Sequence, residues 1–212
     1  MARVGNADIR WIDQRRNTRA GPFVVGTLVP DEFAACLRVL HPAQRSGNGL
    51  VQDVRWQDIA MSNGRTLSSL SHYEDISPPG SLSDLDLAKP LQGQLADRLC
   101  EELAATLSRH THTPADCIFM FSSSWGSLLP SNAELTRVQL YEGDYVVTTG
   151  RCAEACDFAV NPTMWWPSDR SWIVVTQVDM DSSFIGCDYV TMKALLESPN
   201  IEAWQVSREA PV

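Results

Sequence analysis

The sequence predicts a single α+β domain in which helices pack on a largely antiparallel sheet. Helical apolar spacing occurs near the start, the middle and the end of the chain. Residues 117–186 contain consecutive strand-like segments with no helix between them. The 212 residues, 44% hydrophobic and 20% charged, suit one globular domain. We expect an N-terminal arm over residues 1–20, flexible or docked on an acidic partner, and one domain over residues 21–212.

The first third of the domain is predicted to hold a strand, two helices and a long loop. PFVVGTLV (22–29) is an apolar, β-branched run typical of a buried strand. Pro30 and the two acids after it indicate a helix start. The apolar residues of that predicted helix are Phe33, Cys36, Leu37 and Leu40, and it stops at His41–Pro42. VRWQDIAMSNG predicts a short second helix, and residues 65–90, rich in Ser, Pro, Gly and Asp, predict an exposed loop.

The remainder is predicted to hold two further helices and the sheet. Leucines every four residues from Leu91 to Leu107 indicate a long helix. A second helix is expected over 188–198, with an acidic residue capping its start. Strands are expected at 117–123, 137–143, 145–150 and 171–180, in SSFIGCD, and at the sheet edge in IEAWQV, with a hairpin turn at Gly143–Asp144.

Composition and charge indicate the class of partner. The net charge of −9 argues against a protein that binds nucleic acid by neutralising phosphates. The chain has no apolar run long enough to cross a membrane, and its first residues do not resemble a secretory signal. We therefore expect a cytoplasmic protein whose six cysteines are small core residues, with disulfides allowed but not required.

Motifs for catalysis are weak. Asp179 and Asp181 follow an apolar strand, as in the DxDx(T/V) signature of aspartate-nucleophile phosphatases. That signature normally lies early in its domain and needs further magnesium ligands downstream, which this sequence lacks. A calcium loop would require glycine where Phe184 stands. Carboxylates in a tight turn are the simpler interpretation of the pair.

Other cofactor and metal motifs are also missing. His110, His112 and Cys117 are residue types that bind zinc, but no second ligand pair has suitable spacing. No P-loop, dinucleotide-binding or nucleophile-elbow motif occurs. The SSSWGS segment is interpreted as a polar loop anchored by Trp125. The sequence therefore predicts no cofactor and no metal.

The segment WWPSDRSW contains three tryptophans and an Asp–Arg pair. Pro167 favours an extended chain before it, so Trp165 and Trp166 should face opposite sides of a strand. One interpretation is a buried tryptophan, a half-covered one, and a structural pair of Asp169 with Arg170. The other is an aromatic and arginine surface for a protein partner or an anionic ligand. Both can hold, one for each tryptophan.

The sequence resembles a family common in actinobacteria. The resemblance rests on GTLVPDEFAACLRVLHPA, VRWQDIA and NPTMWWPSDRSWIVVTQVDMDSSFIGC, in that order, over about residues 22–206. Members carry V-P-x-x-F…R-V-L-H-P-A and W-W-P-x-D-R-x-W segments, and usually Gly-Gly where Ile185-Gly186-Cys187 stands here. The resemblance implies no activity and no catalytic residue. The order of elements is also similar to the SMI1/KNR4-like (SUKH) superfamily, which includes immunity proteins that neutralise toxins through an acidic, aromatic-rich face.

Two functional hypotheses follow. The first is a non-catalytic cytoplasmic module that binds an unknown protein partner, in an immunity-like role. Its surface, or the support of that surface, would contain Trp165, Trp166, Asp169, Arg170 and Trp125. The alternative is a small-molecule-binding protein or hydrolytic enzyme. Its pocket would lie near Asp179, Asp181 and Arg170, beside the loop 65–90.

Overall fold

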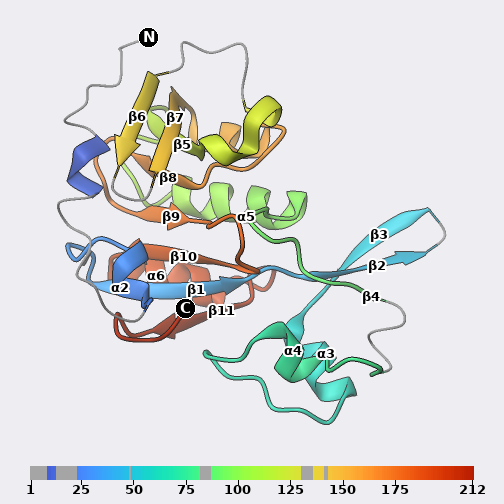
Figure 1. The fold of residues 1–212 in the computed structure, drawn as a ribbon. Coiled ribbons are helices and arrows are strands. Elements are labelled where there is room, and N and C mark those ends of the chain that lie inside the picture. Colours follow the sequence, from blue (N-terminus) through green and yellow to red (C-terminus); the bar gives the residue numbers. More distant parts are fainter. Residues whose placement is uncertain (1–8, 13–22, 48, 82–86, 130–135, 141–142) are drawn as a thin grey trace.

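Two antiparallel sheets organise the computed structural model, which describes residues 9–12, 23–47, 49–81, 87–129, 136–140 and 143–212. The large sheet has eight strands in the order β11-β1-β10-β9-β8-β5-β7-β6, and the small sheet has the order β3-β2-β4 (Figure 1). The predicted single α+β domain with a largely antiparallel sheet is confirmed. The strands of the large sheet are β1 (Ala35–Leu40), β5 (Cys117–Ser122), β6 (Thr136–Leu140), β7 (Gly143–Gly150), β8 (Met164–Pro167), β9 (Ile173–Val175), β10 (Ser182–Cys187) and β11 (Ala203–Val206).

The strands of the second half largely follow the prediction. β5, β6, β7, β10 and the edge strand β11 lie where they were expected. β9 is shorter than the predicted 171–180 segment, because the chain leaves the sheet after Val175. The turn prediction at Gly143–Asp144 was wrong. Both residues belong to β7, where they pair with Leu140 and Gln139, and residues 141–142 lie outside the described residues.

The first two elements were predicted wrongly. The expected helix after Pro30 is the strand β1, which pairs with β10 on one side and β11 on the other. All six of its residues are buried. A strand covered on both faces loses its alternating pattern, so its apolar run resembles a buried helix. The expected strand over 22–29 is reduced to one bridge between Val24 and Pro211, followed by the single helical turn α2 (Val25–Leu28).

The helices were predicted more successfully. α3 (Trp56–Ser62) lies within the second predicted helix, and α6 (Tyr189–Glu197) begins at Asp188, whose carboxylate accepts from the Thr191 N–H at 2.7 Å. The predicted loop contains one helical turn, α4 (Tyr73–Ile76). α5 spans Asp97–Ser108 and so begins six residues after Leu91. Short 3-10 helices, η2 (Ser123–Leu128) and η3 (Cys152–Cys156), follow β5 and β7. None of the described helices has the length and apolar character to span a bilayer.

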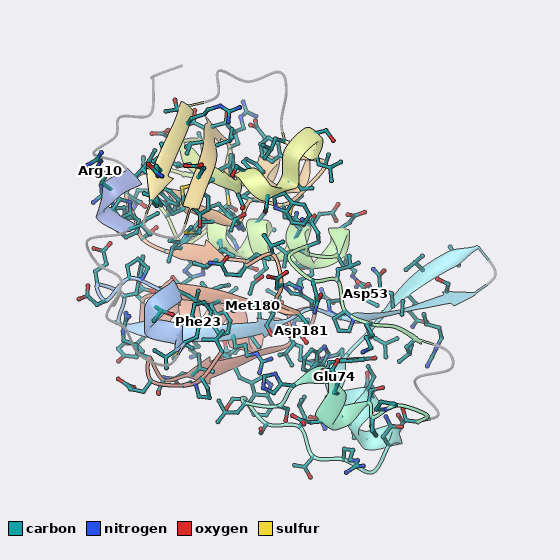
Figure 2. All side chains as sticks on the ribbon, in the orientation of Figure 1. Arg10, Phe23, Asp53, Glu74, Met180 and Asp181 are labelled. Carbon is teal, nitrogen blue, oxygen red and sulfur yellow. A yellow bond between two sulfur atoms is a disulfide. The ribbon has the colours of Figure 1, made fainter. Side chains whose placement is uncertain are left out.

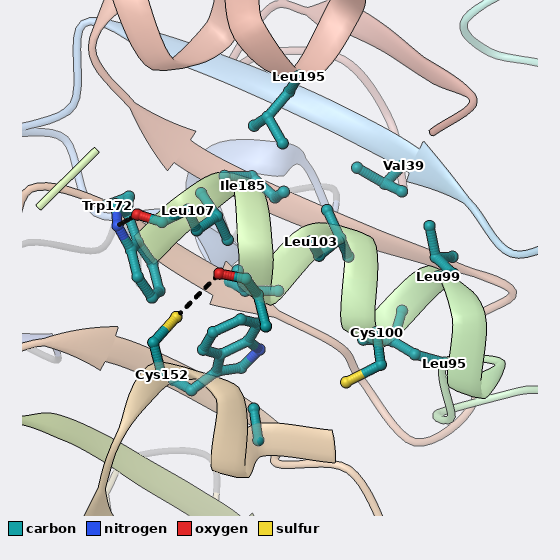
Figure 3. Packing of buried hydrophobic residues seen from close by; sticks show 14 of the residues in the cluster. Val39, Leu95, Leu99, Cys100, Leu103, Leu107, Cys152, Trp172, Ile185 and Leu195 are labelled. Carbon is teal, nitrogen blue, oxygen red and sulfur yellow. Dashed lines mark hydrogen bonds between the residues drawn. The ribbon is translucent and has the colours of Figure 1, made fainter. Parts of the chain in front are cut away.

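Both faces of the large sheet are covered. α5, α6 and η3 cover one face, where Leu103, Leu107, Ile185 and Leu195 are buried (Figure 3). The other face is covered by α2, the C-terminal residues and the N-terminal segment 9–12. Ile9, Trp11 and Ile12 are buried, so this part of the predicted flexible arm is packed on the domain. The rest of the arm, residues 1–8 and 13–20, lies outside the described residues.

Candidate binding surface at the projecting hairpin

Trp165 and Trp166 are both fully buried. Trp165 packs against Trp172 with the ring centroids 5.0 Å apart, on the face that α5 covers. Trp166 packs against Trp11 at 5.9 Å on the opposite face. The prediction of opposite faces was correct, but the prediction of a half-covered tryptophan was wrong, because the segment 9–12 covers the second face. Neither ring is available to a partner.

Asp169 and Arg170 contact different parts of the fold. The Asp169 carboxylate accepts from the His112 N–H at 2.7 Å and from the Thr111 hydroxyl at 2.9 Å. Burial acts to raise the pKa of Asp169, but hydrogen bonds from His112, Ser171 and Thr111 outweigh it and lower the pKa. Arg170 instead lies over the ring of Trp11, 4.9 Å from its centroid. The expected Asp–Arg pair is absent from the described ion pairs, and both residues support the fold.

Trp125 is half-buried, unlike Trp165 and Trp166. It lies in η2 and packs against the buried cluster that contains the apolar residues of α5. Its indole N–H has no hydrogen-bond partner within the described part of the chain. The five residues predicted as a surface are therefore not assembled into one, because two of them are buried on opposite faces of the sheet.

The acidic pair lies in the turn before β10. Asp179 is exposed, and the Asp181 carboxylate accepts from the Ser182 hydroxyl at 2.9 Å and lies 3.7 Å from the Arg38 guanidinium. Arg170 contacts Trp11 instead. It therefore does not supply the positive charge of the pocket that was predicted around Asp179, Asp181 and Arg170. Over the described ranges, no group of three His, Cys, Asp or Glu residues could hold a metal ion.

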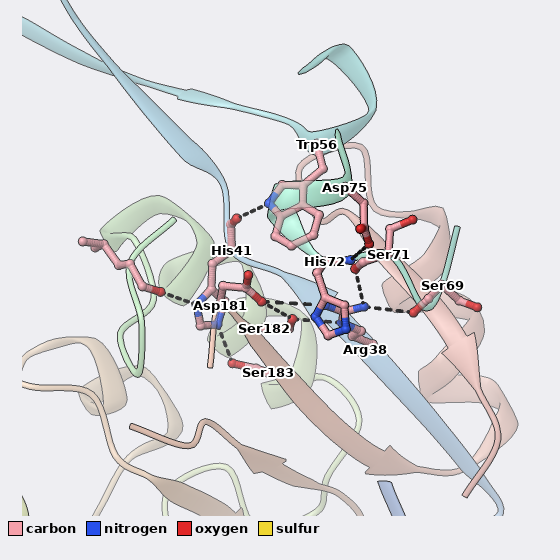
Figure 4. Close-up of polar contacts among 11 residues, drawn as sticks. Arg38, His41, Trp56, Ser69, Ser71, His72, Asp75, Asp181, Ser182 and Ser183 are labelled. Carbon is pink, nitrogen blue, oxygen red and sulfur yellow. Dashed lines mark hydrogen bonds and ion pairs between the residues drawn. The ribbon is translucent and has the colours of Figure 1, made fainter. Parts of the chain in front are cut away.

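A buried polar network that the sequence did not reveal lies beside Asp181 (Figure 4). His41 Nδ1 lies 2.8 Å from the Leu91 carbonyl oxygen, so it must carry the proton and donate. Nε2 then accepts from the Ser183 hydroxyl at 2.9 Å. Burial lowers the pKa of His41 to about 4, which keeps the ring neutral at neutral pH. Ser183 and His41 have no exposed surface, so this Ser–His contact cannot receive a substrate.

Arg38 extends the network towards the loop that contains α4. Its guanidinium donates to the Ser69 and Ser71 carbonyl oxygens at 3.1 and 2.8 Å, and to the Ser182 hydroxyl at 2.9 Å. Burial lowers the pKa of Arg38, and the nearby Asp181 charge opposes that shift. Arg38 was missed because it stood in a predicted helix, and His41 because it stood where that helix was predicted to stop. Arg38 lies on β1 and His41 directly follows it, and their hydrogen bonds join the loop 68–71 and the segment before α5 to this end of the sheet.

A hairpin projects from the domain beyond this network (Figure 1). It consists of β2 (Ala43–Gly47) and β3 (Leu50–Val54), and the sequence between the two strands is Asn-Gly, a dipeptide typical of tight hairpin turns. β4 (Leu87–Ala88) pairs with the other side of β2, and only near the hairpin base. The outer edge of β3 has no partner strand among the described residues. Leu50 and Val51 on this edge are 74% and 64% exposed.

The base of the hairpin is held rigidly. Ala43 packs in a small core with Leu40, Trp56 and Tyr73. The Trp56 indole N–H donates to the His41 carbonyl oxygen at 2.7 Å. The Glu202 carboxylate accepts from the Trp56 N–H at 2.7 Å, which joins the start of α3 to β11. A projection with an ordered base and an apolar tip is suited to contact another molecule.

A cleft of about 170 Å³ opens at the same base. It is bounded by the hairpin, by the first turn of α5 and by the connection from α6 to β11. Its lining residues are Leu40, Pro42, Asp53, Arg55, Arg98, Leu99, Pro199, Asn200 and Glu202. None of the three residues predicted for the alternative pocket lines it. The hairpin edge and this cleft therefore lie next to each other at the base of the projection.

The fold and this surface define an α+β protein with a doubly covered antiparallel sheet and a projecting β-hairpin. Among known proteins, no family model, no curated sequence and no solved structure matches this chain. The resemblances drawn from the sequence therefore remain predictions.

Proposed function

We propose that this protein is a non-catalytic protein-binding module whose binding element is the projecting hairpin. This proposal rests on the exposure of Leu50 and Val51, 74% and 64%, on β3, whose outer edge has no partner strand among the described residues. Native proteins normally protect such edges with charge, proline or a covering segment, because an open apolar edge pairs with other strands. An edge left open on an ordered projection is consistent with a partner that covers it.

The partner that fits is a protein that offers an extended strand with aliphatic side chains. Such a strand would pair with β3 through main-chain hydrogen bonds and place its side chains beside Leu50 and Val51. A nucleic acid is a poorer fit, because the net charge is −9 and the exposed tip is apolar. An immunity-like role is the narrower form of this proposal, in which the partner would be a toxin.

The predicted cytoplasmic location is part of the same proposal. The structure joins Cys100 to Cys156 by a disulfide. Reducing compartments disfavour such bonds, so the oxidation state of this pair bears on the location.

The test compares two variants in an extract of the cells that express the protein. Val51→Lys adds a charge to the edge strand, and Met61→Lys adds the same charge to α3 at a similar exposure of 68%. We expect the wild type and Met61→Lys to capture the same protein and Val51→Lys to lose it. With that protein purified, binding should slow hydrogen exchange of the β3 amides. Capture of nothing, equal capture by Val51→Lys, or unchanged exchange in β3 would each contradict the proposal.

A further inference from the structure

We propose that the cleft at the base of the projecting hairpin binds a zwitterionic small molecule, an α-amino acid with an aliphatic side chain. The polar groups of the cleft differ in how far they are already hydrogen-bonded within the fold. Ligand binding here is independent of strand pairing at the outer edge of β3, so it goes beyond the protein-binding proposal.

Glu202 and Asn200 are already occupied. Both Glu202 oxygens accept main-chain hydrogen bonds from the start of α3, at 2.7 Å from Trp56 and 2.9 Å from Gln57. The Asn200 amide donates to Glu102 at 2.8 Å and accepts from Arg98 at 3.2 Å. These contacts hold Glu202 and Asn200 in place and use part of their hydrogen-bonding capacity.

Asp53 and Arg55 are the charged groups of the cleft with the fewest contacts, although the Arg55 charge lies close enough to Glu202 to act against the burial that raises the pKa of that carboxyl. Within the described chain, Arg55 forms no hydrogen bond or ion pair through its guanidinium, and Asp53 receives only one long contact, 3.4 Å from the Gln44 amide. The chain is extended at Arg55, so these side chains, two residues apart, project to the same side. Figure 2 shows Asp53 where the hairpin leaves the domain.

One ligand class satisfies both charges at once. A carboxylate can accept two parallel hydrogen bonds from the Arg55 guanidinium, with Arg98 supplying a second cation across the cleft. An ammonium group can pair with Asp53. Pro42 and Pro199 add apolar lining suited to an aliphatic side chain, together with Leu40 and Leu99, which are only 2% and 4% exposed. A simple anion would leave Asp53 unpaired, and a simple cation would leave Arg55 with Glu202 as its nearby opposite charge.

The size of the cleft sets the upper limit of the ligand. One ordered water needs about 10–15 Å³ of such space, so about 170 Å³ admits a molecule of roughly ten non-hydrogen atoms. Leucine, with its branched aliphatic side chain, is within that limit and serves as the probe.

The experiment is a titration of the full-length protein with leucine, followed by NMR and calorimetry. Acetate and isoamylamine, which carry the carboxylate or the amine alone, are the ligand controls. We expect saturable shifts with leucine and much weaker ones with either control. Arg55→Gln and Asp53→Asn should each weaken leucine binding at least about tenfold. Arg65→Gln, an exposed arginine outside the cleft, should leave it unchanged.

Three results would overturn the proposal. They are no saturable change with leucine, equal shifts with acetate or isoamylamine, and equal affinity in Arg55→Gln and Arg65→Gln. Circular dichroism of each variant ensures that a loss reflects the cleft and not unfolding. Val51→Lys should bind leucine like the wild type, so failure here and failure of the protein-binding proposal are separate outcomes.

Discussion

The Arg170 guanidinium lies 4.9 Å from the centroid of the Trp11 ring, and Trp11 meets Trp166 edge-on at 5.9 Å. The turn after β8 therefore holds the N-terminal segment 9–12 against the sheet. Arg170 does so with a φ of 55°, a left-handed conformation that costs energy for any residue with a Cβ. The WWPSDRSW segment, which first suggested a binding surface, secures the packing of a distant part of the chain.

The contact and backbone conformation of Arg170 predict that glycine at this position destabilises the protein less than alanine does. Arg170→Ala loses the cation–π contact but keeps the left-handed strain, so its free energy of unfolding should fall by about 1 kcal/mol. Arg170→Gly loses the same contact and relieves the strain, so it should be the more stable of the two by about 1 kcal/mol. Urea unfolding measures both, and Arg151→Ala, at an exposed arginine, should show no loss. Equal stabilities for the alanine and glycine variants would refute the strain argument.

Burial of His41 predicts a loss of stability in mild acid. The folded pKa of about 4 lies below the ordinary value of 6.5, so the unfolded chain takes up the proton first as the pH falls. The contribution of neutral His41 to the free energy of unfolding is therefore complete above pH 6.5. It is lost between pH 6.5 and 4, and the total loss is about 3 kcal/mol. Urea unfolding across this range should show a shallower pH dependence in His41→Asn than in the wild type.

A second measurement tests His41 without a substitution. The ring signals of His41 in the wild-type protein should stay those of a neutral imidazole until the pH approaches 4. Titration near pH 6.5 would show that the ring is not held neutral by burial, and would remove the basis of the stability prediction.

Local patterns of the sequence predicted much of the large sheet and the helix α6. Burial and pairing with distant segments decided the rest. Arg38 was placed in a helix that stops at His41 because β1, covered on both faces, shows no alternation. One of Trp165 and Trp166 was expected to be half-covered, because nothing local shows that residues 9–12 cover the face on which Trp166 lies. Asp53, Arg98 and Glu202 meet at one cleft from three separate segments, and no local motif marks such a site.

The late start of α5 has a cause that can be tested at Gly93. Leu91 and Leu95 fit the helical period, but Gly93 has a φ of 66° and donates its N–H to the Met180 carbonyl oxygen at 2.9 Å. A Cβ there would lie 2.5 Å from the Val178 carbonyl oxygen, whereas Gly64, with a φ of 62°, has no atom within 4 Å of such a Cβ. Gly64→Ala should lower the free energy of unfolding by about 1 kcal/mol, and Gly93→Ala should lower it by about 2 kcal/mol more. Equal losses in thermal or urea unfolding would contradict the close approach.

The disulfide between Cys100 and Cys156 predicts both a thiol count and a stability difference. Their Cα atoms lie 5.8 Å apart across a sequence separation of 56, and the remaining described cysteines, Cys36, Cys117, Cys152 and Cys187, are free and buried. Denatured, unreduced protein should therefore show four titratable thiols, and six after reduction.

Closing a loop of this length stabilises the fold by about 4 kcal/mol in the chain-entropy model. The free energy of unfolding of the Cys100→Ser, Cys156→Ser double variant should therefore be lower by about that amount. Adding reductant should lower the unfolding midpoint of the wild type and leave that of the double variant unchanged. Six thiols in protein kept under oxidising conditions would show that the bond does not form, and would favour the reducing location expected from the sequence.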